Sequence, residues 1–188
     1  MAKMKAAYEE LLASIPDYRA FLSVDELDRS SKTLAARYPE CVAILEIGKT
    51  RMSRPLYALR IGSGAHTAVV PGCPHPNEPI GTMMIEFFAE ALAKNETLRK
   101  ELDYTWYFVK AWDADSVKLN EGWFKGPFTI KNYVRHHFRP ALFEQVDWTF
   151  PVHYKELHFE RGVPETEAVR SLIDEVKPDF IYSLHNSG

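Results

Sequence analysis

Residues Val69-Val-Pro-Gly-Cys-Pro-His75-Pro-Asn-Glu78-Pro-Ile-Gly81 join the end of an apolar run to the start of a helical pattern. The run predicts a short strand over Thr67–Val70 that stops at Pro71-Gly72. A helix is predicted over Ile80–Lys94, because Pro79 suits a first helical turn and the apolar residues form one broad stripe. That stripe consists of Ile80, Met83, Met84, Phe87, Phe88 and Ala91. A strand that leads directly into a helix is typical of an α/β domain.

The rest of the chain adds strands and helices of the same kind. Ser23-Val-Asp-Glu26 has the spacing of a capping box and predicts a helix that ends near Tyr38-Pro39. Further strands are predicted over Cys41–Ile47, Leu56–Ile61, Tyr104–Trp112 and Asp179–Leu184, and a further helix over Glu165–Val176. Residues 113–164 show no clear period. The alternation of strands and helices predicts an α/β layered domain with a mixed, mainly parallel sheet.

Length and composition favour one soluble globular domain. The chain has 188 residues, of which 46% are hydrophobic and 26% charged, and its formal net charge is −3. The charge balance lacks the basic excess of nucleic-acid-binding proteins, so we expect no nucleic-acid partner. No apolar run approaches the roughly 18 residues that cross a bilayer, and no signal peptide is recognisable. Cys41 and Cys73 cannot build a disulfide framework, so we expect a cytoplasmic protein without membrane contact; the composition does not indicate an oligomeric state.

The last residues suggest a longer protein. His185-Asn-Ser-Gly188 directly follows a predicted apolar strand, and no later element is predicted to cover that strand. A buried type of strand in this position would leave an exposed, adhesive edge. We therefore expect residues 1–188 to form a single α/β domain of catalytic type that is truncated shortly after His185.

Three side chains at strand ends form a candidate metal site. His75 offers an imidazole nitrogen, and Glu78 offers a carboxylate three residues later in the same strand-to-helix loop. His185 lies at the carboxyl end of another predicted strand, the edge at which open α/β sheets bind ligands. Two imidazoles and a carboxylate suit Zn²⁺ and leave a position for water, as in catalytic zinc sites. A Glu beside a helix N-terminus is otherwise only a favourable partner of the helix dipole.

The His-x-x-Glu spacing occurs again at His153-Tyr-Lys-Glu156. This copy lies in the region without a clear period, where two solvated surface residues are the simpler interpretation. Cys73, two residues before His75, could approach a metal ion, but a small buried thiol is the commoner case.

The order of these landmarks resembles the M14 zinc metallocarboxypeptidases. The landmarks are Glu46-Ile-Gly48-Lys-Thr-Arg-Met-Ser-Arg54-Pro-Leu-Tyr-Ala-Leu59, Pro71-Gly-Cys-Pro-His75-Pro-Asn-Glu78 and Tyr182-Ser-Leu-His185. The resemblance covers nearly the whole chain. It implies the three-layer α/β/α carboxypeptidase fold, with His75, Glu78 and His185 matching the zinc ligands. It also implies a zinc-dependent hydrolase in which zinc-activated water attacks an amide bond of a peptide.

The resemblance further implies an arginine that stabilises the oxyanion formed during hydrolysis. In Asn132-Tyr-Val-Arg135-His-His-Phe-Arg139-Pro, either arginine could match this position. We favour Arg135 as the catalytic arginine and expect Arg139 to bind substrate, since a guanidinium near the metal would offset developing negative charge. For both Arg135 and Arg139, the alternative is an ordinary solvent-exposed arginine without a role in the site.

Two departures from the family pattern bear on the substrate and on catalysis. The family's Asn-Arg pair, which grips a C-terminal carboxylate, is missing from the corresponding stretch Val146-Asp-Trp-Thr-Phe-Pro151. The family's general base is a Glu downstream of the third ligand. Residues 1–188 offer no clear replacement, because the geometry of Glu156, Glu160 and Glu165 is not fixed by the sequence. Without a base, a loss of about 10²–10⁴-fold in rate is expected, so residues 1–188 alone should catalyse poorly.

These departures leave alternatives open. Asn77 within the first motif looks like the His-Gly-Asn-Glu variant of the succinylglutamate desuccinylase and aspartoacylase branch. The alternatives are an N-acyl amino acid deacylase or a peptidoglycan amidase on the same fold, or a non-catalytic metal-binding module.

Overall fold

The computed structural model describes the backbone of residues 2–186 and the side chains of residues 8–186. Its main sheet has the strand order β1-β2-β4-β3-β7. The strands are β1 (Val42–Lys49), β2 (Pro55–Ile61), β3 (His66–Pro71), β4 (Tyr104–Val109) and β7 (Phe180–Ile181). β1, β2 and β4 pair antiparallel, whereas β4, β3 and β7 pair parallel. The prediction of a mixed sheet is confirmed, with its parallel part confined to the half that ends in β7.

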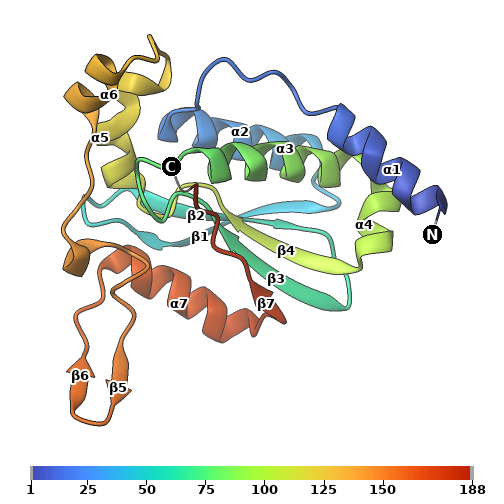
Figure 1. The fold of residues 1–188 in the computed structure, drawn as a ribbon. Coiled ribbons are helices and arrows are strands. Elements are labelled where there is room, and N and C mark those ends of the chain that lie inside the picture. Colours follow the sequence, from blue (N-terminus) through green and yellow to red (C-terminus); the bar gives the residue numbers. More distant parts are fainter. Residues whose placement is uncertain (1, 187–188) are drawn as a thin grey trace.

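Helices cover both faces of this sheet and give three layers (Figure 1). On one face lie α1 (Ala2–Ala13), α2 (Val24–Arg37), α3 (Ile80–Lys94) and α4 (Glu96–Leu102), and α7 (Pro164–Val176) lies on the other. Successive strand residues point to opposite faces. Ala68 and Val70 therefore pack in the core beneath α3, while Val69 packs in the core beneath α7. The expected α/β/α architecture is confirmed.

The start of α2 shows how the sequence fixes an element locally. The Ser23 side chain accepts a hydrogen bond from the backbone of Glu26, and the Glu26 carboxylate accepts one from the backbone of Ser23. This reciprocal pair satisfies backbone N–H groups that a helix start otherwise leaves without partners. The capping box predicted at this position is confirmed.

Residues 113–164, where no period was recognised, contain several short elements. They are α5 (Ala114–Phe124), α6 (Ile130–His136), the 3₁₀ turn η1 (Leu142–Glu144), and a hairpin of β5 (Val152–Tyr154) and β6 (Leu157–Phe159). α5 is buried on several sides, so its sequence lacks a single apolar stripe. The hairpin extends away from the body of the molecule (Figure 1).

The last strand is shorter than predicted. β7 covers only Phe180–Ile181, both of which are exposed, and a single parallel bridge then joins Leu184 to Gly72. The strand predicted over Asp179–Leu184 is therefore too long, whereas the exposed edge expected at this position is observed. The reason is position, because in the described chain β7 has a partner on one side only and lies at the edge of the sheet.

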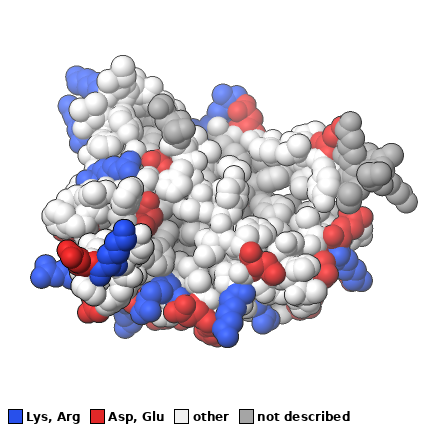
Figure 2. All heavy atoms as spheres, turned by 60° about the horizontal axis from the view of Figure 1, so that its bottom comes forward, with Lys and Arg blue, Asp and Glu red and all other residues white. Residues whose placement is uncertain are grey.

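On the face shown in Figure 2, acidic and basic side chains are interspersed around an uncharged middle, without a continuous basic area on that face. Within residues 2–186, none of the helices combines the length and the apolar character required to cross a bilayer.

Candidate metal centre

The carboxyl ends of β3 and β7 bring the three predicted ligands together. His75 and Glu78 lie in the loop from β3 to α3, and His185 follows β7. The backbone N–H of Leu184 donates to the carbonyl of Pro71 at 3.0 Å, so the two strand ends are held side by side. Residues 110 positions apart in the sequence thereby face one another.

The donor atoms of this cluster are within hydrogen-bond distance of each other. His75 Nδ1 is 2.9 Å from Glu78 Oε1, and His185 Nδ1 is 3.1 Å from both His75 Nδ1 and Glu78 Oε2. One ligand atom from each residue lies within 4.8 Å of the others. His75 and Glu78 are nearly buried, and His185 is partly open to solvent, which leaves an approach from outside.

The orientation of both imidazole rings suits metal binding through Nδ1. His75 Nε2 lies 3.0 Å from Asp147 Oδ2, and His185 Nε2 lies 3.1 Å from Ser183 Oγ. Metal-binding histidines commonly direct their second nitrogen to a carboxylate or another polar group, which fixes the ring and its tautomer. With both Nε2 atoms directed elsewhere, both Nδ1 atoms face Glu78. Two imidazole nitrogens and a carboxylate oxygen are donors that Zn²⁺ accepts, so these residues fit a zinc ion.

Close packing of α3 against Leu184 fixes the position of His185. A Cβ on Gly81 would lie 2.6 Å from Leu184 Cβ and 2.9 Å from the Leu184 carbonyl oxygen. Glycine at this position lets the first turn of α3 lie directly against the residue before His185. The backbone N–H of Asn186 also contacts Glu78 Oε2 at 3.3 Å.

Cys73 is a buried residue of the core. Its thiol is fully buried and accepts a hydrogen bond from Thr82 Oγ1 at 3.0 Å. Burial raises the pKa of Cys73 to about 12. A thiol that stays protonated is a poor metal ligand, in agreement with the interpretation of Cys73 as a small core residue.

Of the two predicted arginines, the structure brings only Arg139 to the cluster. Arg139 Nη1 lies 3.4 Å from Glu78 Oε1, and its Nη2 donates to Gln145 Oε1 at 3.2 Å. Arg135 is exposed in the last turn of α6, and among residues 8–186 its side chain forms neither a hydrogen bond nor an ion pair. Arg139 is thus the residue of the pair whose charge can act on a group bound at the cluster.

The stretch that would carry the carboxylate-gripping pair faces elsewhere. Thr149 is completely buried, and its hydroxyl bonds that of Thr166 at 2.7 Å. Trp148 is largely exposed. Asp147, in the same stretch, instead supports His75. The role of Asp147 was not foreseen, although its place directly after the apolar Val146 and within the quoted family stretch was a usable indication.

The three acidic residues considered as replacement bases do not contact the cluster. Glu165 is buried and bonds Arg51, while Glu156 and Glu160 belong to the β5–β6 hairpin region. Among residues 8–186, the carboxylates in contact with the three donors are Glu78 itself and Asp147.

Arg51, paired with two buried carboxylates, anchors the segment that carries Arg139 and Asp147. Arg51 Nη2 contacts Asp113 Oδ1 at 2.6 Å, its Nε contacts Glu165 Oε1 at 3.1 Å, and its Nη1 donates to the Glu144 carbonyl at 3.1 Å. Burial, partly offset by Arg51, raises the pKa of Asp113 to about 6. Arg51 therefore links the core to the residue that precedes Gln145.

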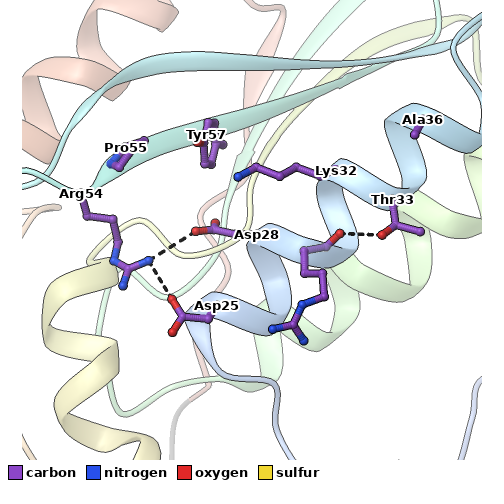
Figure 3. Close-up of a pocket in the computed structure, with 9 residues that line it drawn as sticks. Asp25, Asp28, Lys32, Thr33, Ala36, Arg54, Pro55 and Tyr57 are labelled. Atoms are coloured by element: carbon purple, nitrogen blue, oxygen red, sulfur yellow. Dashed lines mark hydrogen bonds and ion pairs between the residues drawn. The ribbon is translucent and has the colours of Figure 1, made fainter.

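A separate groove lies between α2 and β2, away from the cluster. Figure 3 shows Arg54 between Asp25 and Asp28, with contacts of 2.9 Å and 3.5 Å to their carboxylates, and Lys32 nearby. Both carboxylates of the groove pair with Arg54, and its lining contains none of the three donor residues. We assign no function to this groove.

Comparison with known proteins places the chain in a family. A sequence model described as zinc carboxypeptidase, Peptidase M14, matches residues 27–188. No curated protein matches. Among solved structures, bovine thrombin-activatable fibrinolysis inhibitor in complex with tick carboxypeptidase inhibitor is 16% identical, with a TM-score of 0.65 over 92% of this chain and 63% of that chain.

Two further structures are similar. The metallo-carboxypeptidase of Burkholderia cenocepacia is 18% identical with a TM-score of 0.64, over 88% of this chain and 41% of that one. The carboxypeptidase A of Helicoverpa armigera is 15% identical with a TM-score of 0.63, over 100% of this chain and 53% of that one. The chain thus spans less than two thirds of each of these structures. Because the family match covers most of its residues, the chain belongs to the M14 zinc carboxypeptidase family.

Proposed function

We propose that this chain is the metal-binding part of a zinc-dependent hydrolase that cleaves an amide bond in a peptide or an N-acyl amino acid. The observation that supports this proposal is the convergence of His75 Nδ1, Glu78 Oε2 and His185 Nδ1 at contacts of 3.1 Å. When bound, zinc supplies a Lewis acid that polarises a carbonyl and lowers the pKa of water. A cytoplasmic location is part of the same proposal.

In this proposal Arg139 acts on the negative charge that develops on the substrate oxygen. Its guanidinium is held by Gln145 and lies 3.4 Å from the Glu78 carboxylate, so little reorganisation is required when charge develops. Fixed donors of this kind are worth far more in a sheltered site than in water. We therefore assign to Arg139, and not to Arg135, the oxyanion-stabilising role.

Asp147 would keep the first ligand in place. Its carboxylate lies 3.0 Å from His75 Nε2 at an ion-pair distance without hydrogen-bond geometry. A negative charge there would favour a proton on Nε2 and so leave the Nδ1 lone pair to the metal. Asp147 is thus a positioning residue. Because its carboxylate faces the outer nitrogen of His75, we do not assign the proton-transfer step to it. That step belongs to a group outside Glu156, Glu160 and Glu165.

One observation favours a second substrate class. Thr149 is buried against Thr166 where the family would present its carboxylate-gripping pair. A substrate without a free C-terminal carboxylate, such as an N-acyl amino acid or a peptidoglycan amide, is therefore the second candidate. Comparing C-terminal residue release with N-acyl amino acid hydrolysis by the full-length protein separates the two, and efficient trimming of ordinary peptides would exclude the deacylase.

The zinc site itself is tested by metal content. After dialysis, the purified chain is expected to retain about one zinc ion, as a three-ligand site should. His75→Ala is expected to lose that ion, whereas His66→Ala, which alters an exposed histidine at the start of β3, is expected to retain it. Equal zinc content in the wild type and His75→Ala, both folded by circular dichroism, would refute the proposal.

A further inference from the structure

The β5–β6 hairpin places two histidines directly opposite each other. His153 pairs with His158 in the antiparallel register, so both side chains lie on one face of the hairpin. Both residues are exposed. Their Nδ1 atoms are 3.0 Å apart, and the ring centroids are 5.2 Å apart at an interplanar angle of 70°. The two strands therefore present a pair of imidazole nitrogens to solvent.

A carboxylate completes this arrangement from the outer side. His153 Nε2 lies 3.0 Å from Glu160 Oε1. A carboxylate that accepts the Nε2 proton leaves a lone pair on Nδ1, and this is the usual environment of a metal-binding histidine. The acidic residue that matters is thus Glu160 and not Glu156 of the His-x-x-Glu motif, because among residues 8–186 Glu156 forms neither a hydrogen bond nor an ion pair with either histidine.

The separation of the two nitrogens indicates which cations fit. With metal–nitrogen bonds of about 2.1 Å, donors 3.0 Å apart subtend an angle of about 90° at the ion. That angle corresponds to neighbouring positions of a square-planar or octahedral ion, whereas a tetrahedral ion would need a separation of about 3.4 Å. Square-planar and octahedral nitrogen sites are typical of Cu²⁺ and Ni²⁺.

We propose that His153 and His158 form a second, surface metal site that binds a Cu²⁺- or Ni²⁺-type dication through both Nδ1 atoms, with Glu160 fixing the ring of His153. This site is separate from the His75 cluster and does not depend on the function proposed for it. Two protein ligands leave the remaining coordination positions to water, so the ion is exchangeable.

The test is a calorimetric titration of the full chain with Ni²⁺ alone at pH 7.5. In the His75→Ala chain the hairpin site is expected to remain. Adding His158→Ala is expected to remove one bound Ni²⁺ per chain. His158→Ala in the otherwise wild-type chain should likewise lose one ion, which keeps the test valid if His75→Ala does not fold.

Two carboxamide variants form a matched pair. Glu160→Gln is expected to weaken Ni²⁺ binding at the hairpin by about tenfold, because the outer partner of His153 becomes neutral. Glu156→Gln, at the hairpin turn, is expected to leave the affinity unchanged. An unchanged Ni²⁺ stoichiometry in His158→Ala would overturn the proposal, since the two nitrogens would then share only a proton. Equal affinities of Glu160→Gln and Glu156→Gln would overturn the role of Glu160.

Discussion

Gly81 lies so close to Leu184 that a Cβ on the glycine would be 2.6 Å from the Leu184 side chain. This contact joins the first turn of α3, which follows Glu78, to the residue before His185. A larger residue at position 81 would clash with Leu184. We infer that the packing of Gly81 against Leu184 sets the distance between the two separate parts of the metal cluster.

Gly81→Ala is therefore expected to move His185 away from His75 and Glu78. Because ligand positions must be correct to within fractions of an ångström, zinc affinity should fall by about 10–100-fold. Competition with a chromophoric chelator measures this change.

Gly48→Ala is the control for that variant. A Cβ on Gly48 would lie 2.8 Å from Ala168 Cβ, a comparable clash at the contact of β1 with α7. We expect Gly48→Ala to lower the free energy of unfolding but to leave zinc affinity unchanged. Equal losses of zinc affinity in both variants would mean that the effect at Gly81 is merely a loss of stability.

Asp147→Asn should weaken zinc binding through His75. The neutral amide no longer favours the proton on His75 Nε2, so about a tenfold loss of zinc affinity is expected. Asp17→Asn, at an exposed position before α2, should have no effect. Wild-type zinc affinity in Asp147→Asn would argue against the positioning role of Asp147.

Asp113 should give the stability a specific pH dependence. Burial raises its pKa from the usual 3.8 of an aspartate to about 6 in the folded protein. The folded state therefore binds more protons than the unfolded state between these values, and stability from this group falls as the pH rises through 6. The loss amounts to about 1–3 kcal/mol.

Asp113→Asn should remove this dependence and still cap α5. The difference in unfolding free energy between wild type and variant, measured in urea from pH 4 to pH 7, is expected to shift against the wild type as pH rises. A difference that stays constant over this range would contradict the assignment to Asp113.

Ser23→Ala removes half of the capping box of α2. The Ser23 hydroxyl accepts from the backbone of Glu26 at 3.3 Å, and its loss should lower the free energy of unfolding by about 1 kcal/mol. Thr33→Ala, at an exposed position within the same helix, should change it by less than about 0.5 kcal/mol. Chemical denaturation of both variants checks this, and equal changes would exclude a capping contribution.

Lys177→Gly is expected to stabilise the protein. Lys177 ends α7 in the left-handed conformation, with φ of 46° and ψ of 63°, where a Cβ is unfavourable. Glycine should raise the free energy of unfolding by about 0.5–1 kcal/mol, as measured by urea denaturation. Lys177→Ala keeps the Cβ and should give no gain, so stabilisation by alanine would assign the effect to the lost lysine side chain.

Features that depend on neighbouring residues in the chain could be predicted from the residues alone. The Ser23–Glu26 capping box, the strand before Pro71 and the helix after Pro79 follow from local hydrogen bonding and from the period of apolar residues. His75 and Glu78 are only three residues apart on the resulting loop, so their proximity could also be predicted. The position of His185 at a strand end could be inferred, because parallel strands end at one edge of a sheet.

The tertiary structure alone decided which distant side chains meet. Arg139 reaches Glu78, and Arg135 does not, because Gln145 and Arg51 fix the path of residues 139–147 through contacts far apart in the sequence. Asp147 is paired with His75 across 72 positions for the same reason. Likewise, the hairpin register brings His158 and Glu160 to His153, which the spacing His153-x-x-Glu156 does not indicate. Periodicity describes how a segment folds, but it carries no information on which segments the closed chain finally places in contact.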